Sequence, residues 1–334
     1  MSERLASYIW YKLGIQDCNK DAARIRPPRM KLIRKLLTLE SSSMKTPHNQ
    51  PSQTFSDGHT IPQLGFGVCG ISREMTESAV DTALETGYRH IDTATIYKNE
   101  KQVGQALKSF GLPREEIFLT GKLWNTDQGF DTALEACEKS LEILGTDYLD
   151  LYLIHWAQPA LGKFQQSWDA LIELRERGLV KSIGVSNFTT EQIDSLQPTG
   201  VAPVVHQIEL HPYLNQADQR ADNAARNILT EAWSPLGQGK DIADDVVGQI
   251  AQEHGASPAQ VIIAWHLALD NVVIPKSVTP KRIRANFEAL DLTLTTDEVN
   301  RISSLPQGSR LGGDPAEGDL GAPEYSDRES FHAK

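Results

Sequence analysis

The sequence has few cysteines and no long apolar run. Its three cysteines, Cys18, Cys69 and Cys137, are odd in number and scattered, so they predict neither a disulfide framework nor a thiolate metal site. No stretch approaches the ~18 apolar residues of a transmembrane helix. Basic residues are also scarce, since 33 Lys and Arg against 44 Asp and Glu leave a net charge of −11. That balance disfavours general binding to nucleic acid or anionic membranes, and we expect an acidic, cytoplasmic globular protein.

The length of 334 residues suits one large α/β domain. Residues 1–43 differ in charge, with nine Lys or Arg against four Asp or Glu, whereas the remainder has 24 against 40. The apolar core of a secretory signal is missing there, because basic residues run through the whole segment. A transit peptide and a true start at Met44 both stay open. We expect residues 1–50 to form a basic, poorly ordered extension and residues 51–334 a single domain, with an irregular tail after about residue 306.

Short β-like runs alternate with helical stretches from residue 64 onward, and eight such units fit a (β/α)8 TIM barrel. Capping boxes at Thr189-x-x-Gln192 and Ser257-x-x-Gln260 mark two of the helix starts. The predicted strands are Leu64–Val68, His90–Ala94, Ile117–Leu123, Tyr148–His155, Val180–Val185, Val204–Gln207, Ile228–Trp233 and Val272–Pro275.

Two local patterns refine this prediction. Asp57-Gly58, between Thr54-Phe55 and Thr60-Ile61, favours an N-terminal β-hairpin with a type I′ turn. Gly65-x-Gly67-x-x-Gly70 matches the dinucleotide fingerprint of a doubly wound sheet, the competing fold. The fingerprint should follow a strand, but here it overlaps the first predicted strand. We therefore reject it and predict the barrel.

The active site of such a barrel forms at the carboxyl ends of its strands. Polar and aromatic side chains follow nearly every predicted strand, an unusual concentration for a purely structural edge. Each has an ordinary reading when taken alone, as a helix cap, a rim charge or a core histidine. The residues at these ends are Asp92, Tyr97, Lys122, His155, Ser186, Asn187, Gln207, Trp233, Lys276 and Ser277.

Four of these side chains predict acid catalysis. Tyrosine is a weak acid at neutral pH, but an ammonium such as Lys122 would lower the pKa of Tyr97, and Asp92 would hold the lysine charged. His155 could orient a substrate oxygen toward Tyr97. No H-x-H or H-E-x-x-H pattern predicts a metal site. The oxygen that receives the proton must therefore gain charge by another route, such as hydride attack on a carbonyl.

A hydride requires a cofactor, and the eighth unit indicates where its phosphates bind. Lys276–Arg284 has four basic residues and no acidic one, and Thr279-Pro280 predicts a helix start. Cations in a first helical turn oppose the helix dipole, a conflict that a bound phosphate removes. An exposed basic turn is the ordinary alternative.

At this point the sequence resembles the aldo-keto reductase family, most of all its bacterial 2,5-diketo-D-gluconate reductase branch. The similarity extends from about Phe55 to Pro306. The matching segments are GYRHIDTATIYKNE (Gly87–Glu100), FLTGKLWN (Phe118–Asn125), DLYLIHW (Asp150–Trp156), SIGVSNF (Ser182–Phe188), HQIELHP (His206–Pro212), EAWSPLGQGK (Glu231–Lys240) and IPKSVTPKRIRANF (Ile274–Phe287).

The resemblance implies a monomeric NADPH-dependent reductase of small aldehydes and ketones, including diketo sugar acids and α-ketoaldehydes. It places the catalytic tetrad at Asp92, Tyr97, Lys122 and His155, with Tyr97 as the acid. It places the substrate pocket at Cys69, Trp124 and Trp156, where Cys69 replaces a frequent aromatic residue. The cofactor residues that it implies are Ser186, Asn187, Gln207, Trp233, Ser234, Leu236, Gln238, Gly239, Lys276, Ser277, Val278, Arg282 and Asn286.

Two other functions remain open at this stage. A Schiff-base lyase could use Lys122 or Lys276 as its nucleophile, but it would have no use for the basic turn or Trp233. A nucleotide sensor without turnover could keep the same fold. The complete tetrad favours the reductase.

Overall fold

The computed structural model describes residues 50–318. The extension predicted at residues 1–50 lies outside this range apart from Gln50, as do residues 319–334 of the predicted tail. Within the range, one sheet of eight parallel strands runs in the order β10-β9-β8-β7-β6-β5-β4-β3. Its strands are β3 (Phe66–Gly67), β4 (His90–Asp92), β5 (Phe118–Leu123), β6 (Leu149–Ile154), β7 (Val180–Ser186), β8 (Val205–Glu209), β9 (Leu229–Trp233) and β10 (Val272–Val273).

Backbone hydrogen bonds between the two edge strands close the sheet into a barrel. Leu64 forms a parallel bridge with Val273, and the Gly65 amide donates to the Val273 carbonyl at 2.8 Å. Each of the eight predicted runs overlaps one strand, with β7 and β8 ending one and two residues later than predicted, so the predicted (β/α)8 barrel is confirmed. The rejection of the glycine fingerprint is consistent with this, since Gly67 lies inside β3.

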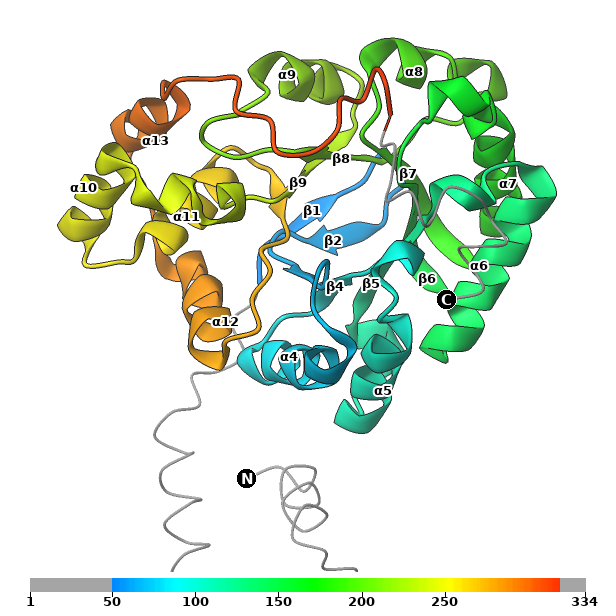
Figure 1. Cartoon of the computed structure of the whole chain (residues 1–334), viewed down its shortest axis with the longest axis horizontal. Helices are drawn as coiled ribbons and strands as arrows, with labels where there is room; N and C mark the ends of the chain where they lie inside the picture. Colours follow the sequence, from blue (N-terminus) through cyan, green and yellow to red (C-terminus); the bar gives the residue numbers. More distant parts are fainter. Residues whose placement is uncertain (1–49, 319–334) are drawn as a thin grey trace, which may run out of the picture. The chain divides into compact units, whose positions relative to one another are not determined.

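Helices surround the strands as a ring (Figure 1). Both predicted capping boxes form, at Thr189 with Gln192 and at Ser257 with Gln260. Each ties the first amides of its helix to side chains, which fixes where the helix begins. The helices are α4 (Arg73–Thr86), α5 (Glu100–Phe110), α6 (Phe130–Leu144), α7 (Phe164–Glu176), α8 (Thr190–Asp194), α9 (Ala217–Ala225), α10 (Asp245–His254), α11 (Pro258–Ala268), α12 (Pro280–Phe287) and α13 (Thr296–Ser303).

The N-terminal hairpin forms, but not with the predicted turn. Strands β1 (Ser52–Thr54) and β2 (Thr60–Pro62) pair antiparallel, leaving a five-residue loop at 55–59. Phe55 still donates its amide to the His59 carbonyl at 2.8 Å, and its carbonyl accepts the Gly58 amide at 3.0 Å. Its side chain is buried against Phe118, with ring centroids 6.1 Å apart. The predicted type I′ turn is wrong, because the bond from the Gly58 amide to the Phe55 carbonyl makes Ser56 and Asp57 the central residues. A type I′ turn needs a positive φ at both central residues, and in this loop only Gly58 has one, at 90°.

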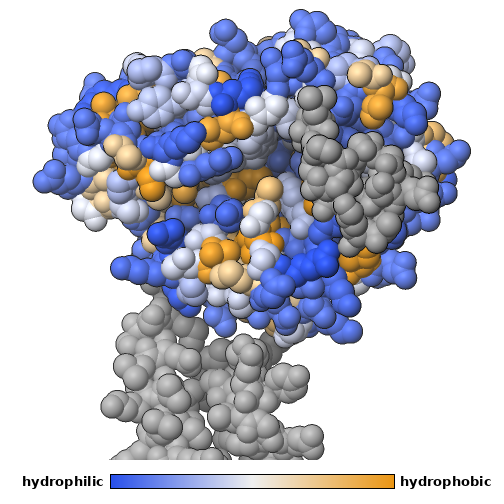
Figure 2. All heavy atoms as spheres, in the orientation of Figure 1, coloured by the Kyte–Doolittle hydropathy of each residue, from blue (hydrophilic) through white to orange (hydrophobic). Residues whose placement is uncertain are grey.

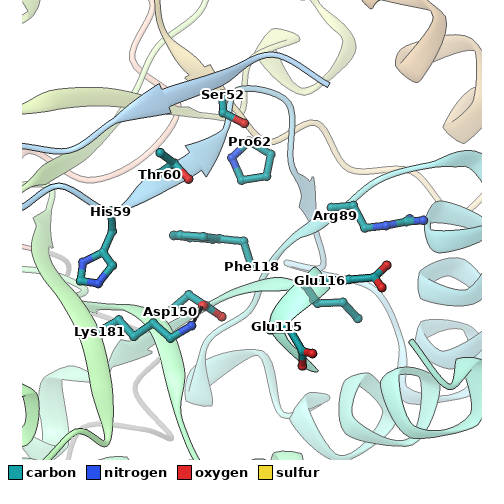
Figure 3. A pocket seen from close by; sticks show the side chains of 11 residues that line it. Ser52, His59, Thr60, Pro62, Arg89, Glu115, Glu116, Phe118, Asp150 and Lys181 are labelled. Carbon is teal, nitrogen blue, oxygen red and sulfur yellow. Dashed lines mark hydrogen bonds and ion pairs between the residues drawn. The ribbon is translucent and has the colours of Figure 1, made fainter. Parts of the chain in front are cut away.

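The hairpin covers the end of the barrel where the strands begin. A cavity of about 260 Å³ lies there, between the hairpin and the starts of β5, β6 and β7 (Figure 3). In its lining, Asp150 forms ion pairs with Lys181 at 2.9 Å and with the neighbouring Arg114 at 2.8 Å. This end of a barrel serves stability, so the chemistry is expected at the opposite end.

The molecular surface is mostly polar on the face shown in Figure 2, with hydrophobic residues in small groups. Within residues 50–318, every helix is too short or too polar to cross a bilayer.

Candidate active site

A buried lysine lies at the centre of the barrel mouth. Lys122, on β5, has no exposed surface, and its ammonium donates to Asp92 Oδ1 at 2.6 Å and to the Thr93 carbonyl at 3.2 Å. A buried cation is tolerable only with such partners, because desolvation of an unpaired charge costs several kcal/mol. The same ammonium lies 3.3 Å from the Tyr97 hydroxyl. This pairing keeps Lys122 charged, which disfavours its use as a Schiff-base nucleophile.

Tyr97 reaches the lysine from the short helix η2 (Thr95–Tyr97), directly after β4. Burial raises its pKa well above 10, and the charges of Cys69 and Asp92 raise it further. The sequence argument predicted a lowered pKa, and that prediction was wrong because desolvation of the phenolate outweighs the nearby ammonium. The hydroxyl thus retains its proton at neutral pH, as a proton donor must.

His155 follows β6 and completes the predicted four. Its ring lies edge-on to Tyr97 and to Trp124, with centroid distances of 5.8 and 5.3 Å. Burial and the charge of Lys122 lower its pKa well below 6.5, so the imidazole is neutral. A neutral ring offers one N–H donor, which can hold a substrate oxygen without competing as an acid.

The predicted substrate pocket lies beside these residues. Trp124 and Trp156 pack together with Ile96, and both indoles are buried. Cys69 is an exposed residue, but burial of its sulfur raises the pKa of the thiol. Trp124 lies against the His155 ring, which also contacts Tyr97, so this part of the predicted pocket is next to the predicted catalytic residues.

The predicted nicotinamide residues form one hydrogen-bonded group on the neighbouring strands. The Ser186 hydroxyl donates to the Gln207 carbonyl at 2.9 Å, and the Asn187 amide donates to Ser186 Oγ at 3.0 Å. The Trp233 indole N–H donates to Asn187 Oδ1 at 2.8 Å, which fixes the ring. Asn187 adopts a left-handed φ of 56°, and its side-chain amide also donates to the His155 carbonyl at 3.1 Å. The structure therefore brings together all four residues of this set.

The remaining predicted residues lie in two loops at the same end. Ser234, Leu236, Gln238 and Gly239 surround the tight turn η7 (Gly237–Gly239) that follows β9. The others follow β10, where α12 begins after Thr279 as expected. Lys276 and Arg282 are exposed there and form no ion pair within residues 50–318, whereas Ser277 and Asn286 are buried and Val278 is half-buried. Cations left unpaired beside free helix amides fit a phosphate.

Two features of the site were not anticipated from the sequence. The first is Glu231, on β9, which is fully buried next to Gln207. The signal that could have identified it in the sequence is an acidic residue in the middle of a predicted buried strand. The second is the C-terminal strap, residues 308–318, which passes from α13 to α8 (Figure 1).

Backbone bonds hold the C-terminal strap to the mouth. Buried Glu209 accepts the amides of Leu311 at 2.6 Å and Gly312 at 2.8 Å. Gly312 lies against the Trp233 indole, where an added Cβ would be 2.5 Å from Cη2. His211 bridges Glu209 at 3.1 Å and Asp241 at 2.8 Å. Asp241 follows η7, so one imidazole connects the strap to the loop after β9.

This bridge predicts a pH-dependent stability. Burial alone would lower the pKa of His211, but bonds to Asp241 and Glu209 raise it to about 9. Because the folded value exceeds the unfolded one of about 6.5, the stabilisation is complete below pH ~6.5, declines above it and is lost beyond pH ~9. Urea unfolding from pH 6 to 10 measures this decline. His211→Gln should remove it, and an equal slope in the variant would contradict the assignment.

The fold and site define a barrel with a buried tyrosine hydroxyl beside a buried lysine–aspartate pair. The Aldo/keto reductase family model matches residues 63–306. The chain belongs to this family and is an oxidoreductase that acts on carbonyl groups.

Relatives share most of the chain. It is 52% identical to an aldo-keto reductase of Mycolicibacterium smegmatis, over 79% of this chain and 97% of the relative. It is 50% identical to methylglyoxal reductase DkgA of Yersinia pestis, over 80% and 96%. A crystal structure of a Gox0644 mutant in complex with NADPH is 45% identical, covers 80% of this chain and 98% of its own, and has a TM-score of 0.77.

Proposed function

We propose that this protein reduces small aldehydes and ketones with NADPH, and that Tyr97 is the proton donor. The proposal rests chiefly on one observation: the Lys122 ammonium contacts Asp92 at 2.6 Å and the Tyr97 hydroxyl at 3.3 Å at the carboxyl ends of the strands. The similarity to methylglyoxal reductase favours α-ketoaldehydes as first substrates. Diketo sugar acids are the second group to test.

The residues present fit NADPH, which supplies the hydride for the carbonyl carbon. Trp233, fixed by Asn187, offers a flat apolar face to a nicotinamide ring, and Ser186, Asn187 and Gln207 offer polar atoms to its carboxamide. Lys276 and Arg282 would hold the adenosine phosphate, with Ser277, Val278 and Asn286 beside them. Ser234, Leu236, Gln238 and Gly239 would enclose the diphosphate.

Side chains of the protein donate the proton and stabilise the charge that remains. As the carbonyl oxygen gains negative charge, Tyr97 donates its hydroxyl proton to it, completing the alcohol. Lys122 stabilises the phenolate that remains, and Asp92 keeps Lys122 charged and in place. Neutral His155 donates a hydrogen bond that orients the carbonyl oxygen toward Tyr97. Trp124 and Trp156 exclude water from this step.

Loss of NADPH absorbance with the purified full chain tests the proposal. We expect turnover with methylglyoxal and other α-ketoaldehydes, and the order of rates across aldehydes, diketones and keto-sugar acids defines the pocket. Tight NADPH binding by fluorescence quenching without turnover on any carbonyl would support the sensor instead. Absence of both binding and turnover would refute the reductase. The cytoplasmic location and the monomeric state expected from the sequence stay predictions.

Changing Arg282 to alanine tests the phosphate assignment. We expect the KM for NADPH to rise about tenfold or more, because a charge-assisted contact with the 2′-phosphate is lost, while the KM for NADH changes little. Steady-state kinetics with both cofactors measure the difference. Arg284→Ala, on the same helix, is the matched control. Equal weakening of both cofactors by Arg282→Ala would contradict the assignment.

A further inference from the structure

The buried polar group at the centre of the barrel includes one residue, Glu231, that the proposed mechanism does not use. Gln207 lies on β8 beside Glu231 on β9, and the two are register partners. The Gln207 Nε2 group donates to Glu231 Oε2 at 2.8 Å and to Asp92 Oδ2 at 2.9 Å. Because an amide nitrogen has two hydrogens, these two carboxyl groups engage both. The amide carbonyl oxygen is then the group that Gln207 has left to present to a ligand.

Burial of Glu231 costs folding free energy, which indicates that this side chain has a function in the site. It has no exposed surface, and desolvation together with the nearby Asp92 charge raises its pKa, while the bond from Gln207 opposes this. Its other oxygen, Oε1, accepts no hydrogen bond within residues 50–318 and faces His90 Nε2 at 3.6 Å. His90 is itself neutral, since burial lowers its pKa to about 3, so it supplies no cation. An apolar side chain would be the cheaper occupant of this site.

The same bonds connect Glu231 to the reacting end of the site. Asp92 uses Oδ2 for Gln207 and Oδ1 for Lys122, and Lys122 contacts Tyr97. Without Glu231, the Gln207 amide could rotate and turn its nitrogen outward. Asp92 would then lose the donor that sets the plane of its carboxylate.

We propose that Glu231 is a positioning residue that orients the Gln207 amide, so that its carbonyl oxygen recognises the amino group of the nicotinamide carboxamide. This inference rests on the proposed NADPH function. It predicts that Glu231, which does not touch the cofactor, determines how Gln207 recognises the carboxamide amino group. A structural role alone would affect stability but not that recognition.

A cofactor lacking the amino group tests the proposal. Reduced 3-acetylpyridine adenine dinucleotide phosphate replaces this amine with a methyl group. For the parent protein we expect kcat/KM with NADPH to exceed that with the analogue by about tenfold or more, because an unmatched buried oxygen is penalised. Glu231→Met should reduce the ratio to within about threefold of unity, whereas Glu231→Gln, which keeps an acceptor oxygen, should largely preserve it.

A matched control separates positioning from stability. Glu100→Met removes another buried carboxylate, which bonds Ser140 on α6 and does not contact Gln207. It should lower the melting temperature and leave the cofactor ratio unchanged. An undiminished ratio in Glu231→Met would overturn the proposal.

A measurement on the parent protein covers the case in which Glu231→Met does not fold. Both side-chain amide protons of Gln207 should exchange slowly with solvent in NMR spectra, because each is bonded to a buried carboxylate. Fast exchange of either proton would overturn the proposal even if the enzyme is active. Lack of any NADPH turnover by the parent would refute the proposed function, and the exchange experiment would still decide the orientation of Gln207.

Discussion

Replacing Tyr97 with phenylalanine is expected to lower kcat for carbonyl reduction by about 10²–10⁴-fold, the usual contribution of a positioned general acid. The change removes only the hydroxyl that lies 3.3 Å from Lys122. The ring keeps its edge-on contact with His155 at 5.8 Å, so the pocket should retain its shape. Stopped-flow measurement of hydride transfer, alongside fluorescence titration with NADPH, separates the chemical step from cofactor binding.

Tyr152→Phe is the control for this experiment. Tyr152 is also fully buried, on β6, and within residues 50–318 its hydroxyl neither donates nor accepts a hydrogen bond. Its loss should leave kcat near the parental value. Parental activity in Tyr97→Phe would exclude Tyr97 as the acid, and loss of NADPH binding in that variant would show that the tyrosine organises the cofactor site.

Replacing Lys122 with methionine should affect both catalysis and stability. Methionine matches the length of the lysine stem, but it leaves Asp92 buried without its cation, and breaking a buried pair in this way costs about 3–5 kcal/mol. The rate should also fall by about 10²-fold or more, since nothing then stabilises the tyrosinate. Urea denaturation measures the first effect and single-turnover kinetics the second.

Lys181→Met gives the matched comparison at the other end of the barrel. Lys181 pairs with Asp150 at 2.9 Å, but its side chain is 39% exposed and Arg114 also contacts that carboxylate. Exposed pairs contribute about 0–1 kcal/mol, so this variant should be nearly as stable and as active as the parent. Comparable destabilisation by the two substitutions would mean that Lys122 is not held as the geometry indicates.

The sequence predicted the strands well because the signal was local. Parallel strands buried on both faces appear as short apolar runs, and all six residues of Leu149–Ile154 are indeed buried. The capping boxes were predictable for the same reason, since Thr189 and Gln192 satisfy each other's backbone within one turn. Strand order then placed the catalytic candidates at one end.

The remaining features depend on tertiary contacts that no local pattern contains. Phe55, at the hairpin loop, is buried against Phe118, on a strand more than sixty residues away in the sequence. The pKa of Tyr97 was set by desolvation, which the spacing of Tyr97 and Lys122 does not reveal. Glu231 and Glu209 are both buried strand residues, and their partners come from β8 and from the C-terminal strap.

The way the C-terminal strap is attached has an evolutionary consequence. Glu209 binds the amides of Leu311 and Gly312, groups that every residue except proline provides. Side chains at positions 309–311 can therefore diversify while the anchoring persists, whereas position 312 has to remain glycine because Trp233 occupies the space of a Cβ. Homologues should therefore differ more often at positions 309–311 than at position 312.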